Sequence, residues 1–145
     1  MVGPVLYQDL LLATDGSEGA RQATEHAIAL AKRLESTLHV VSVAEEGPHS
    51  SSKRDEMRAD EQGEAAQAVE EAERLAADEG VEATTTVLEG VPQEEIVGFA
   101  ECNPIDMIVV GTVGRTGLDH LLLGSVAEEV VRNAQVPVVT VRAQR

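Results

Sequence analysis

The 145-residue sequence predicts an α/β domain, a three-layer sandwich in which helices cover both faces of a five-stranded parallel sheet. Two observations predict this class. Five short apolar runs bounded by turn residues alternate with longer segments whose apolar residues recur at helical spacing. Hydrophobic residues make up 43% of the chain, enough to fill the core of one domain of ordinary size. We therefore expect a single domain over residues 1–145, with right-handed crossovers between its strands.

The first half of the chain predicts two strands and two helices. The apolar runs at residues 9–15 and 37–44 are typical of buried strands. Ser17 is expected to cap the first helix, whose buried stripe comprises Ala20, Ala23, Ala27, Leu30, Ala31 and Leu34. The segment between Glu45 and Asp55 contains Gly, Pro and three Ser and predicts a surface loop. A helix over residues 55–78 is expected to follow, with a buried stripe of Ala65, Ala68, Val69, Ala72, Leu75 and Ala76.

The second half continues the alternation. Gly80 is expected to end the long helix, and Pro92 to lie in the first turn of the next one. A last helix is predicted at Ser125–Asn133, with three side chains available for packing: Val126, Val130 and Val131. The remaining strands are expected at residues 81–90, 105–111 and 136–142.

The charge balance excludes one class of partner. The formal net charge is -15, and a chain so acidic repels nucleic acid. Acidic residues are abundant and there are only two lysines, Lys32 and Lys53, which favours a protein of a salt-rich cytosol over an ordinary acidic protein.

The aromatic residues are Tyr7 and Phe99 alone. A bound nucleotide base would therefore be held by aliphatic walls and backbone groups rather than between aromatic rings.

The single cysteine and the lack of long apolar runs restrict the redox chemistry and the cellular location that we expect. The one cysteine, Cys102, allows no intrachain disulfide, and we expect it to be a partly buried residue at a helix end. No apolar run approaches the roughly 20 residues of a membrane span. The segment at residues 1–9 lacks the pattern of a signal peptide, so we expect a cytoplasmic protein without a membrane partner.

Two loops that follow strands carry unusual chemistry. One is Thr14–Ser17, and the other is the glycine-rich segment 111–125. Glycines let backbone N–H groups approach phosphate oxygens closely. Gly124 and Ser125 open a helix, whose N-terminus favours anions, and Arg115 is the basic side chain within the loop. If the first and fourth strands are neighbours where the strand order reverses, both loops line one crevice that can bind a nucleotide.

Other motifs and residues point to no second chemistry. The sequence contains neither G-x-x-x-x-G-K-[ST] nor G-x-G-x-x-G after the first strand, which excludes a P-loop and disfavours a dinucleotide fold of that type. We expect His39 to pack or hydrogen-bond and Asp106 to serve a turn or cap. No His and Cys residues have zinc spacing, and no catalytic residue or metal ligand can be named.

The spacing of the glycine loop resembles the signature of the nucleotide-binding universal stress proteins. Gly111 and Gly114 are separated by two residues, and nine residues then precede Gly124 and Ser125. The segments LLLATDGSE, LHVVSV, EGVPQEEI and NAQVPVVTVR also resemble the family, so the likeness covers nearly the whole chain. It implies strand order 3-2-1-4-5 in a Rossmann-like fold of the adenine nucleotide alpha hydrolase type.

The resemblance also implies a ligand and its contacts. ATP would lie across the first and fourth strands, with Mg²⁺ accompanying the triphosphate; AMP or ADP remain alternatives. Asp15 would contact the nucleoside, and the backbone of Val40 the adenine. Ala13 and Val110 are weaker matches for the base or ribose pocket. The matches to phosphate binding are Gly111, Gly114, Gly124 and Ser125, followed directly by Val126.

Three functions are compatible with these observations. The favoured one is a regulatory ATP-binding protein of the stress response. A slow ATPase or phosphotransferase is the second, and a dimer that acts by protein contact, with a vestigial nucleotide site, is the third. The apolar strand Val136–Val141 is expected at a sheet edge, where it invites pairing. The family resemblance implies a homodimer through the same strand.

Overall fold

The computed structural model describes residues 7–45, 51–112 and 124–142, with the backbone alone for residues 51–61. Strands and helices alternate along the chain, as the sequence predicts. In chain order they are β1 (Asp9–Ala13), α1 (Glu18–Leu34), β2 (Thr37–Glu45), α2 (Ser51–Asp78), β3 (Ala83–Gly90), α3 (Pro92–Cys102), β4 (Met107–Gly111), α4 (Ser125–Asn133) and β5 (Val138–Val141).

The five strands form one sheet in the order β3-β2-β1-β4-β5, and every neighbouring pair is parallel. The expected α/β class and strand order are confirmed. Leu11 on the central strand β1 pairs with His39 on β2 and with Ile108 on β4. The strand order reverses between β1 and β4, so the loops that follow these two strands leave the same edge of the sheet side by side.

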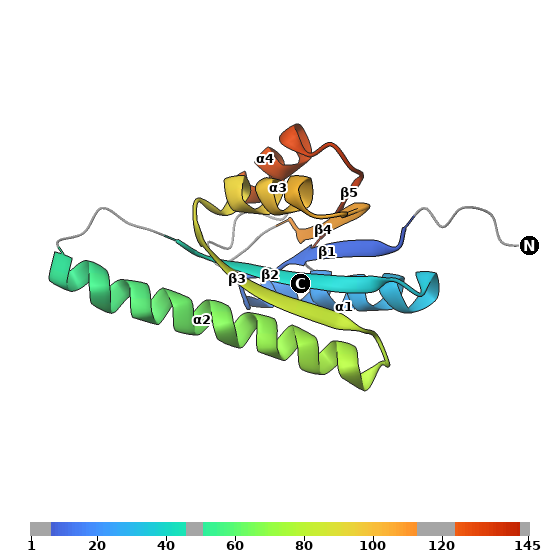
Figure 1. The fold of residues 1–145 in the computed structure, drawn as a ribbon, viewed down its shortest axis with the longest axis horizontal. Coiled ribbons are helices and arrows are strands. Elements are labelled where there is room, and N and C mark those ends of the chain that lie inside the picture. The colour runs from blue at the N-terminus through green and yellow to red at the C-terminus, as the bar shows by residue number, and fades with distance from the viewer. Residues whose placement is uncertain (1–6, 46–50, 113–123, 143–145) are drawn as a thin grey trace, which may run out of the picture.

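Helices cover both faces of the sheet, which gives three layers (Figure 1). α1 and α2 lie below the sheet in this view, and α3 and α4 lie above it. Side chains alternate between the two faces along each strand, so each face has its own core. Leu10, Leu12 and Val40 pack with α1 and α2, whereas Leu11, Val41 and Val110 pack with α3 and α4.

The helix ends follow from local chemistry. The Ser17 hydroxyl accepts a hydrogen bond from Ala20 N–H at 3.2 Å, which is the predicted N-cap. Gly80, with φ +74, follows the end of α2 as expected, and Pro92 occupies the first turn of α3. Glu35 ends α1 at φ 56, an uncommon conformation for a residue with a side chain.

Several expectations about local structure are wrong. α2 begins at Ser51, so the end of the expected Glu45–Asp55 loop is helical; a long helix needs no strong local signal once its later turns are packed. Leu34 lies in the last turn of α1 and is 36% exposed. Val131, which was expected to pack, is 47% exposed, whereas Ala127 and Val130 are the buried residues of α4. Cys102 is exposed rather than partly buried; it is the last residue of α3, and its neighbours Glu101 and Asn103 are exposed too.

Candidate functional site

A cavity of about 240 Å³ lies at the carboxyl edge of the sheet, on the side of α3 and α4. Its walls come from the ends of β1, β2 and β4, from the start of α3 and from the first turn of α4. This is the position at which open parallel sheets bind ligands, next to the reversal of strand order. The crevice predicted from the sequence is therefore present in the described part of the chain.

The turn after β1 forms one wall, and hydrogen bonds hold it rigidly. Thr14 N–H donates to the carbonyl of Val41 at 3.0 Å and extends the pairing of β1 with β2. The Thr14 hydroxyl accepts from Gly16 N–H at 3.1 Å, and Asp15 Oδ1 accepts from Ser17 N–H at 2.9 Å. Such side-chain to backbone bonds are why Thr and Asp favour tight turns. Gly16, with φ +78, supplies the backbone conformation that the turn needs.

The start of α4 forms the opposite wall. Gly124 is its N-cap and provides no side-chain acceptor for the first turn. The first N–H groups of a helix have no acceptor within the helix, and they carry its positive dipole end. Gly124 N–H itself donates to the carbonyl of Thr112 at 2.6 Å, which ties α4 to the end of β4. This wall can therefore offer N–H donors and the Ser125 hydroxyl to an anion.

Charge is distributed unevenly around the cavity. The carboxylates that line it, Asp15 and Glu45, lie at the ends of β1 and β2. Lys, Arg and His are absent from its described lining. An anion bound here would depend on the donors at β4 and α4 rather than on a cation from the described residues. A carboxylate repels a phosphate but accepts hydrogen bonds from neutral hydroxyl groups, so the surroundings of Asp15 and Glu45 suit hydroxyl groups better than phosphate.

The structure brings most of the predicted site residues together. Those that line the cavity are Ala13, Asp15, Val110, Gly111, Gly124, Ser125 and Val126. Gly114 and Arg115 lie outside the described residues. Val40 does not line the cavity: its side chain is fully buried on the other face of the sheet, in the core with α1 and α2.

Sequence reasoning missed part of the wall. Val41 and Val43 line the cavity at the end of β2, together with Pro92 and Ile96 from α3. The alternation of strand side chains could have indicated Val41, because Val41 and Leu11 share the face covered by α3 and α4. Thr112 also lines the cavity, and no sequence signal distinguishes it from its neighbours.

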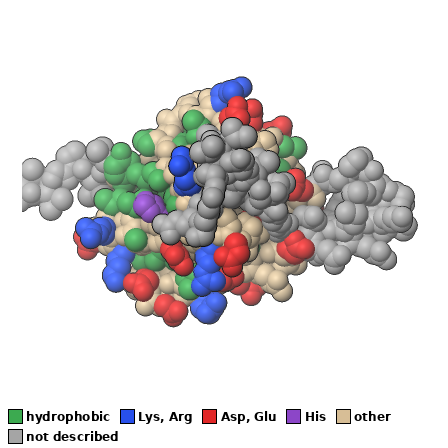
Figure 2. Space-filling model, turned by 180° about the vertical axis from the view of Figure 1, so that it is seen from behind, with side chains coloured by type: hydrophobic (Ala, Val, Ile, Leu, Met, Phe, Trp, Pro, Cys, Tyr) green, Lys and Arg blue, Asp and Glu red, His purple; other side chains and the backbone are tan. Residues whose placement is uncertain are grey.

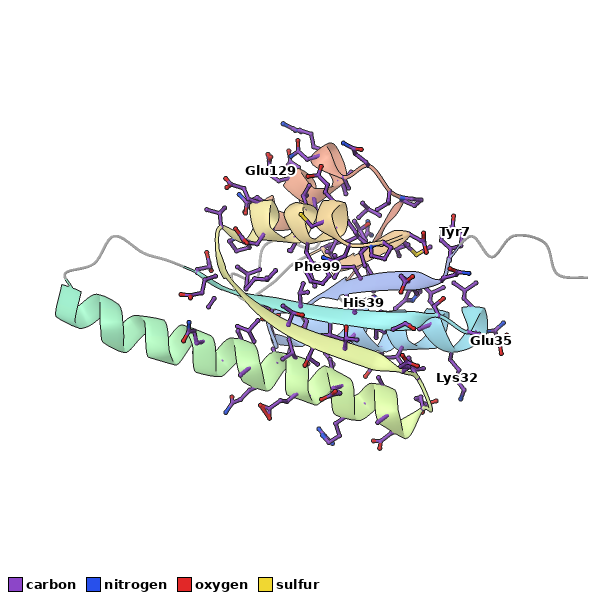
Figure 3. The ribbon with its side chains drawn as sticks, viewed as in Figure 1. Tyr7, Lys32, Glu35, His39, Phe99 and Glu129 are labelled. Carbon is purple, nitrogen blue, oxygen red and sulfur yellow. The ribbon has the colours of Figure 1, made fainter. Side chains whose placement is uncertain are left out.

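Polar groups away from the cavity form a separate cluster. His39 lies on β2 (Figure 3), with Nε2 at 2.8 Å from Asp9 Oδ1 and Nδ1 at 2.9 Å from Thr84 Oγ1. The expectation that His39 hydrogen-bonds is confirmed. In the described part of the chain, no group of three or more His, Cys, Asp or Glu residues could hold a metal ion. No helix among the residues described is long and apolar enough to cross a membrane.

Comparisons with known proteins agree on one family. A model of the universal stress protein family matches residues 6–142. The chain is 39% identical to a universal stress protein of Methanocaldococcus jannaschii, over 97% of this chain and 85% of that protein. The structure of universal stress protein UspA from Lactobacillus plantarum is similar with a TM-score of 0.86 at 25% identity, covering 94% of this chain and 98% of that one. A universal stress protein in complex with cAMP is similar with a TM-score of 0.75 at 26% identity, covering 96% and 99%.

Proposed function

This chain belongs to the universal stress protein family, and from that premise we propose that it is a regulatory protein that binds an adenine nucleotide, ATP above all, in the cavity at the carboxyl edge of its sheet. One observation carries the proposal: the ends of β1, β2 and β4 line the same cavity as the N-terminus of α4, which has no side-chain cap. The complex of a similar universal stress protein with cAMP supports an adenine nucleotide as the ligand class.

We assign the two ends of the nucleotide to opposite walls. The adenine would lie against the aliphatic side chains of Val41 and Val43, at the end of β2. The side chain of Val40 packs on the other face of the sheet, so Val40 could contact the adenine only through its backbone, as the resemblance implies, and we assign the side-chain contact to Val41. The ribose would lie near Asp15, and the phosphates near Gly124 and Ser125. The glycine signature at Gly111, Gly114 and Gly124 supports the phosphate end of this arrangement.

Mg²⁺ would enter with the triphosphate. The carboxylates that line the cavity are oxygen donors of the kind that Mg²⁺ prefers, and Mg²⁺ usually takes its other ligands from phosphates and water. The residues present therefore fit a phosphate-bound Mg²⁺ that takes most of its ligands from phosphate and water. The ion would neutralise phosphate charge in a cavity whose described lining contains no Lys, Arg or His.

We propose binding rather than fast turnover as the main activity. The described walls offer backbone N–H groups, hydroxyls and carboxylates, and a general base would have to come from the carboxylates. Slow hydrolysis or phosphotransfer is the second candidate, with Asp15 positioned near the nucleotide. Binding of the nucleotide would stabilise the folded state and could shift a surface that partners recognise.

We also propose a homodimer in the cytoplasm, formed through the last strand. β5 is the edge of the sheet beside β4, and its outer side has no neighbouring strand in the described part of the chain. The segment that would pair is Val136–Val141. Should the nucleotide site prove vestigial, this contact would be the remaining route to a function.

Calorimetric titration with ATP, ADP and AMP, with and without Mg²⁺, tests the proposal. The variant Ser125→Asp places a negative charge at the start of α4, where it stabilises the helix but repels a phosphate. We expect wild-type binding and at least about a tenfold loss in Ser125→Asp, equivalent to about 1.4 kcal/mol. Gln67→Asp adds the same charge on the exposed face of α2, away from the cavity, and should retain binding. A folded wild-type protein that binds none of the three nucleotides would refute the proposal.

A further inference from the structure

Thr112 combines a cavity position with an unsatisfied polar group. It follows the last residue of β4 and lines the cavity. The residue is only 6% exposed. Of the buried side-chain nitrogen and oxygen atoms in the described part of the chain, Oγ1 of Thr112 alone has no hydrogen-bond partner. Buried hydroxyls are almost always paired, so this exception points to a partner other than the described residues, such as a ligand in the cavity.

The backbone of Thr112 is fully used by the fold. Its N–H donates to the carbonyl of Val141 at 2.9 Å, and its carbonyl accepts from Gly124 N–H at 2.6 Å. The residue is therefore held between the end of β5 and the start of α4. The hydroxyl cannot gain a partner through a shift of its own backbone without breaking these bonds.

The other buried threonines behave differently. The Thr14 hydroxyl, on the same cavity, accepts from Gly16 N–H at 3.1 Å. The Thr24 hydroxyl donates to the carbonyl of Ala20 at 3.1 Å within α1. The local backbone therefore satisfies these two side chains, whereas no described residue satisfies Thr112.

The charges of the cavity indicate what that partner is. Thr112 lies beside Gly124 and Ser125, on the wall with donors, and Asp15 and Glu45 lie on the strands beyond it. Because β1 stands between β2 and β4 in the sheet, one strand separates an anion at Thr112 from the end of β2, where Glu45 lies. A hydroxyl donor beside a helix N-terminus suits a phosphate oxygen.

We propose that the Thr112 hydroxyl donates a hydrogen bond to the 5′-phosphate of the bound adenine nucleotide and thereby makes the site prefer nucleotides over nucleosides. This inference rests on the proposed function, and it adds a specificity-determining residue to that site. Because no described residue pairs with the hydroxyl, its removal should weaken binding without weakening the ligand-free fold. A structural hydroxyl would show the opposite pattern.

The test compares Thr112→Val with wild type in two measurements. Displacement of a fluorescent adenine nucleotide by AMP and by adenosine gives the affinity for each, including weak ligands. Urea unfolding without ligand gives the stability. We expect Thr112→Val to lose about tenfold in AMP affinity. Adenosine affinity should change less than about twofold, and the urea midpoint should stay equal or rise. Thr112→Ser keeps the hydroxyl and should recover most of the AMP affinity.

Thr24→Val is the matched control. It removes a buried threonine hydroxyl that has a partner and lies outside this cavity, so it should lower the urea midpoint and leave AMP affinity unchanged. The inference is overturned if Thr112→Val binds AMP as tightly as wild type or loses affinity for AMP and adenosine to the same extent. It is also overturned if the variant is destabilised or unfolded without ligand. If the wild-type protein binds neither the fluorescent nucleotide nor AMP nor adenosine, the proposed function itself is overturned.

Discussion

Asp9 and Asp106 are joined by a reciprocal pair of hydrogen bonds across the start of the sheet. Asp106 N–H donates to the carbonyl of Asp9 at 2.8 Å, and Asp9 N–H donates to Oδ2 of Asp106 at 3.0 Å. Oδ2 of Asp106 also accepts from Gln8 N–H at 2.9 Å. The carboxylate of Asp9 is directed to His39 instead, so the two acidic side chains have separate partners.

Asp106→Ala should therefore destabilise the fold. The change removes the acceptor of two backbone N–H groups at the start of β1, and bonds to a charged acceptor contribute about 1.5–3 kcal/mol. We expect a loss of about 2 kcal/mol in the free energy of unfolding, measured with urea. Asp106→Asn retains one oxygen acceptor and should lose about half as much. Equal stability of all three proteins would show that these bonds contribute nothing.

Gly16→Ala should destabilise the turn that borders the cavity. A Cβ at residue 16 would lie 3.2 Å from Cβ of Ala68 on α2, and φ there is +78. A left-handed conformation alone costs a residue with a side chain about 1–2 kcal/mol. Gly63→Ala is the control within α2, where a Cβ meets nothing within 4 Å. It should stabilise the protein by about 0.5–1 kcal/mol. Relative to wild type, we expect the urea midpoint to fall for Gly16→Ala and to rise for Gly63→Ala.

The sequence predicts the elements well because each depends on a local pattern. The stripe of α2 is buried as expected, with Leu75 at its margin, and Ser17 caps α1. The start of α2 at Ser51 escaped prediction, because its first turns follow a run of Ser rather than an apolar pattern. The strand order came from the resemblance to a family, since no local rule orders five parallel strands.

In the site too, some features follow from neighbouring residues in the sequence and others depend on residues far apart in the chain. The turn chemistry of Asp15 and the helix start at Ser125 are readable from neighbouring residues. Val41 rather than Val40 presents its side chain to the cavity because of which face of β2 meets α3 and α4, and that depends on the packing of distant elements. The two bonds from Asp106 span 97 and 98 residues, which no local pattern reveals.

Ala13→Leu should block the cavity and leave the fold intact. Ala13 ends β1, is partly exposed and lines the cavity, so a larger side chain has space to occupy. We expect at least about a tenfold loss of ATP affinity by calorimetry, equivalent to about 1.4 kcal/mol. Ala13→Ser alters polarity with little change in size and should bind within a few-fold of wild type. Unchanged ATP binding by a folded Ala13→Leu protein would place the nucleotide elsewhere.

Salt should stabilise the protein. The net charge of -15 produces self-repulsion, and monovalent salt shortens its reach from about 10 Å at 0.1 M to about 3 Å at 1 M. On the face in Figure 2, acidic and basic side chains are interspersed, so screening also weakens some attractive pairs. Exposed pairs such as Lys32–Glu79 contribute little, and repulsion should dominate. We expect the Tm to rise by about 4 °C or more between 0.1 and 2 M KCl. NaCl should act alike, and a Tm that falls with both salts would contradict the explanation.

Thr140→Pro should separate the proposed dimer. The carbonyl of Pro137 accepts from Ile108 N–H on β4, and that of Val141 accepts from Thr112 N–H just after β4. The alternation of a strand therefore turns the N–H of Thr140 toward the free edge. Proline at that residue removes an edge donor and spares the bonds to β4, which is where proline is tolerated in sheets. Light scattering after size exclusion should show a dimer for wild type and a monomer for Thr140→Pro. Thr140→Val keeps the N–H and should remain dimeric. A wild-type monomer at micromolar concentration would refute the dimer, and a dimeric Thr140→Pro would move the contact away from this edge.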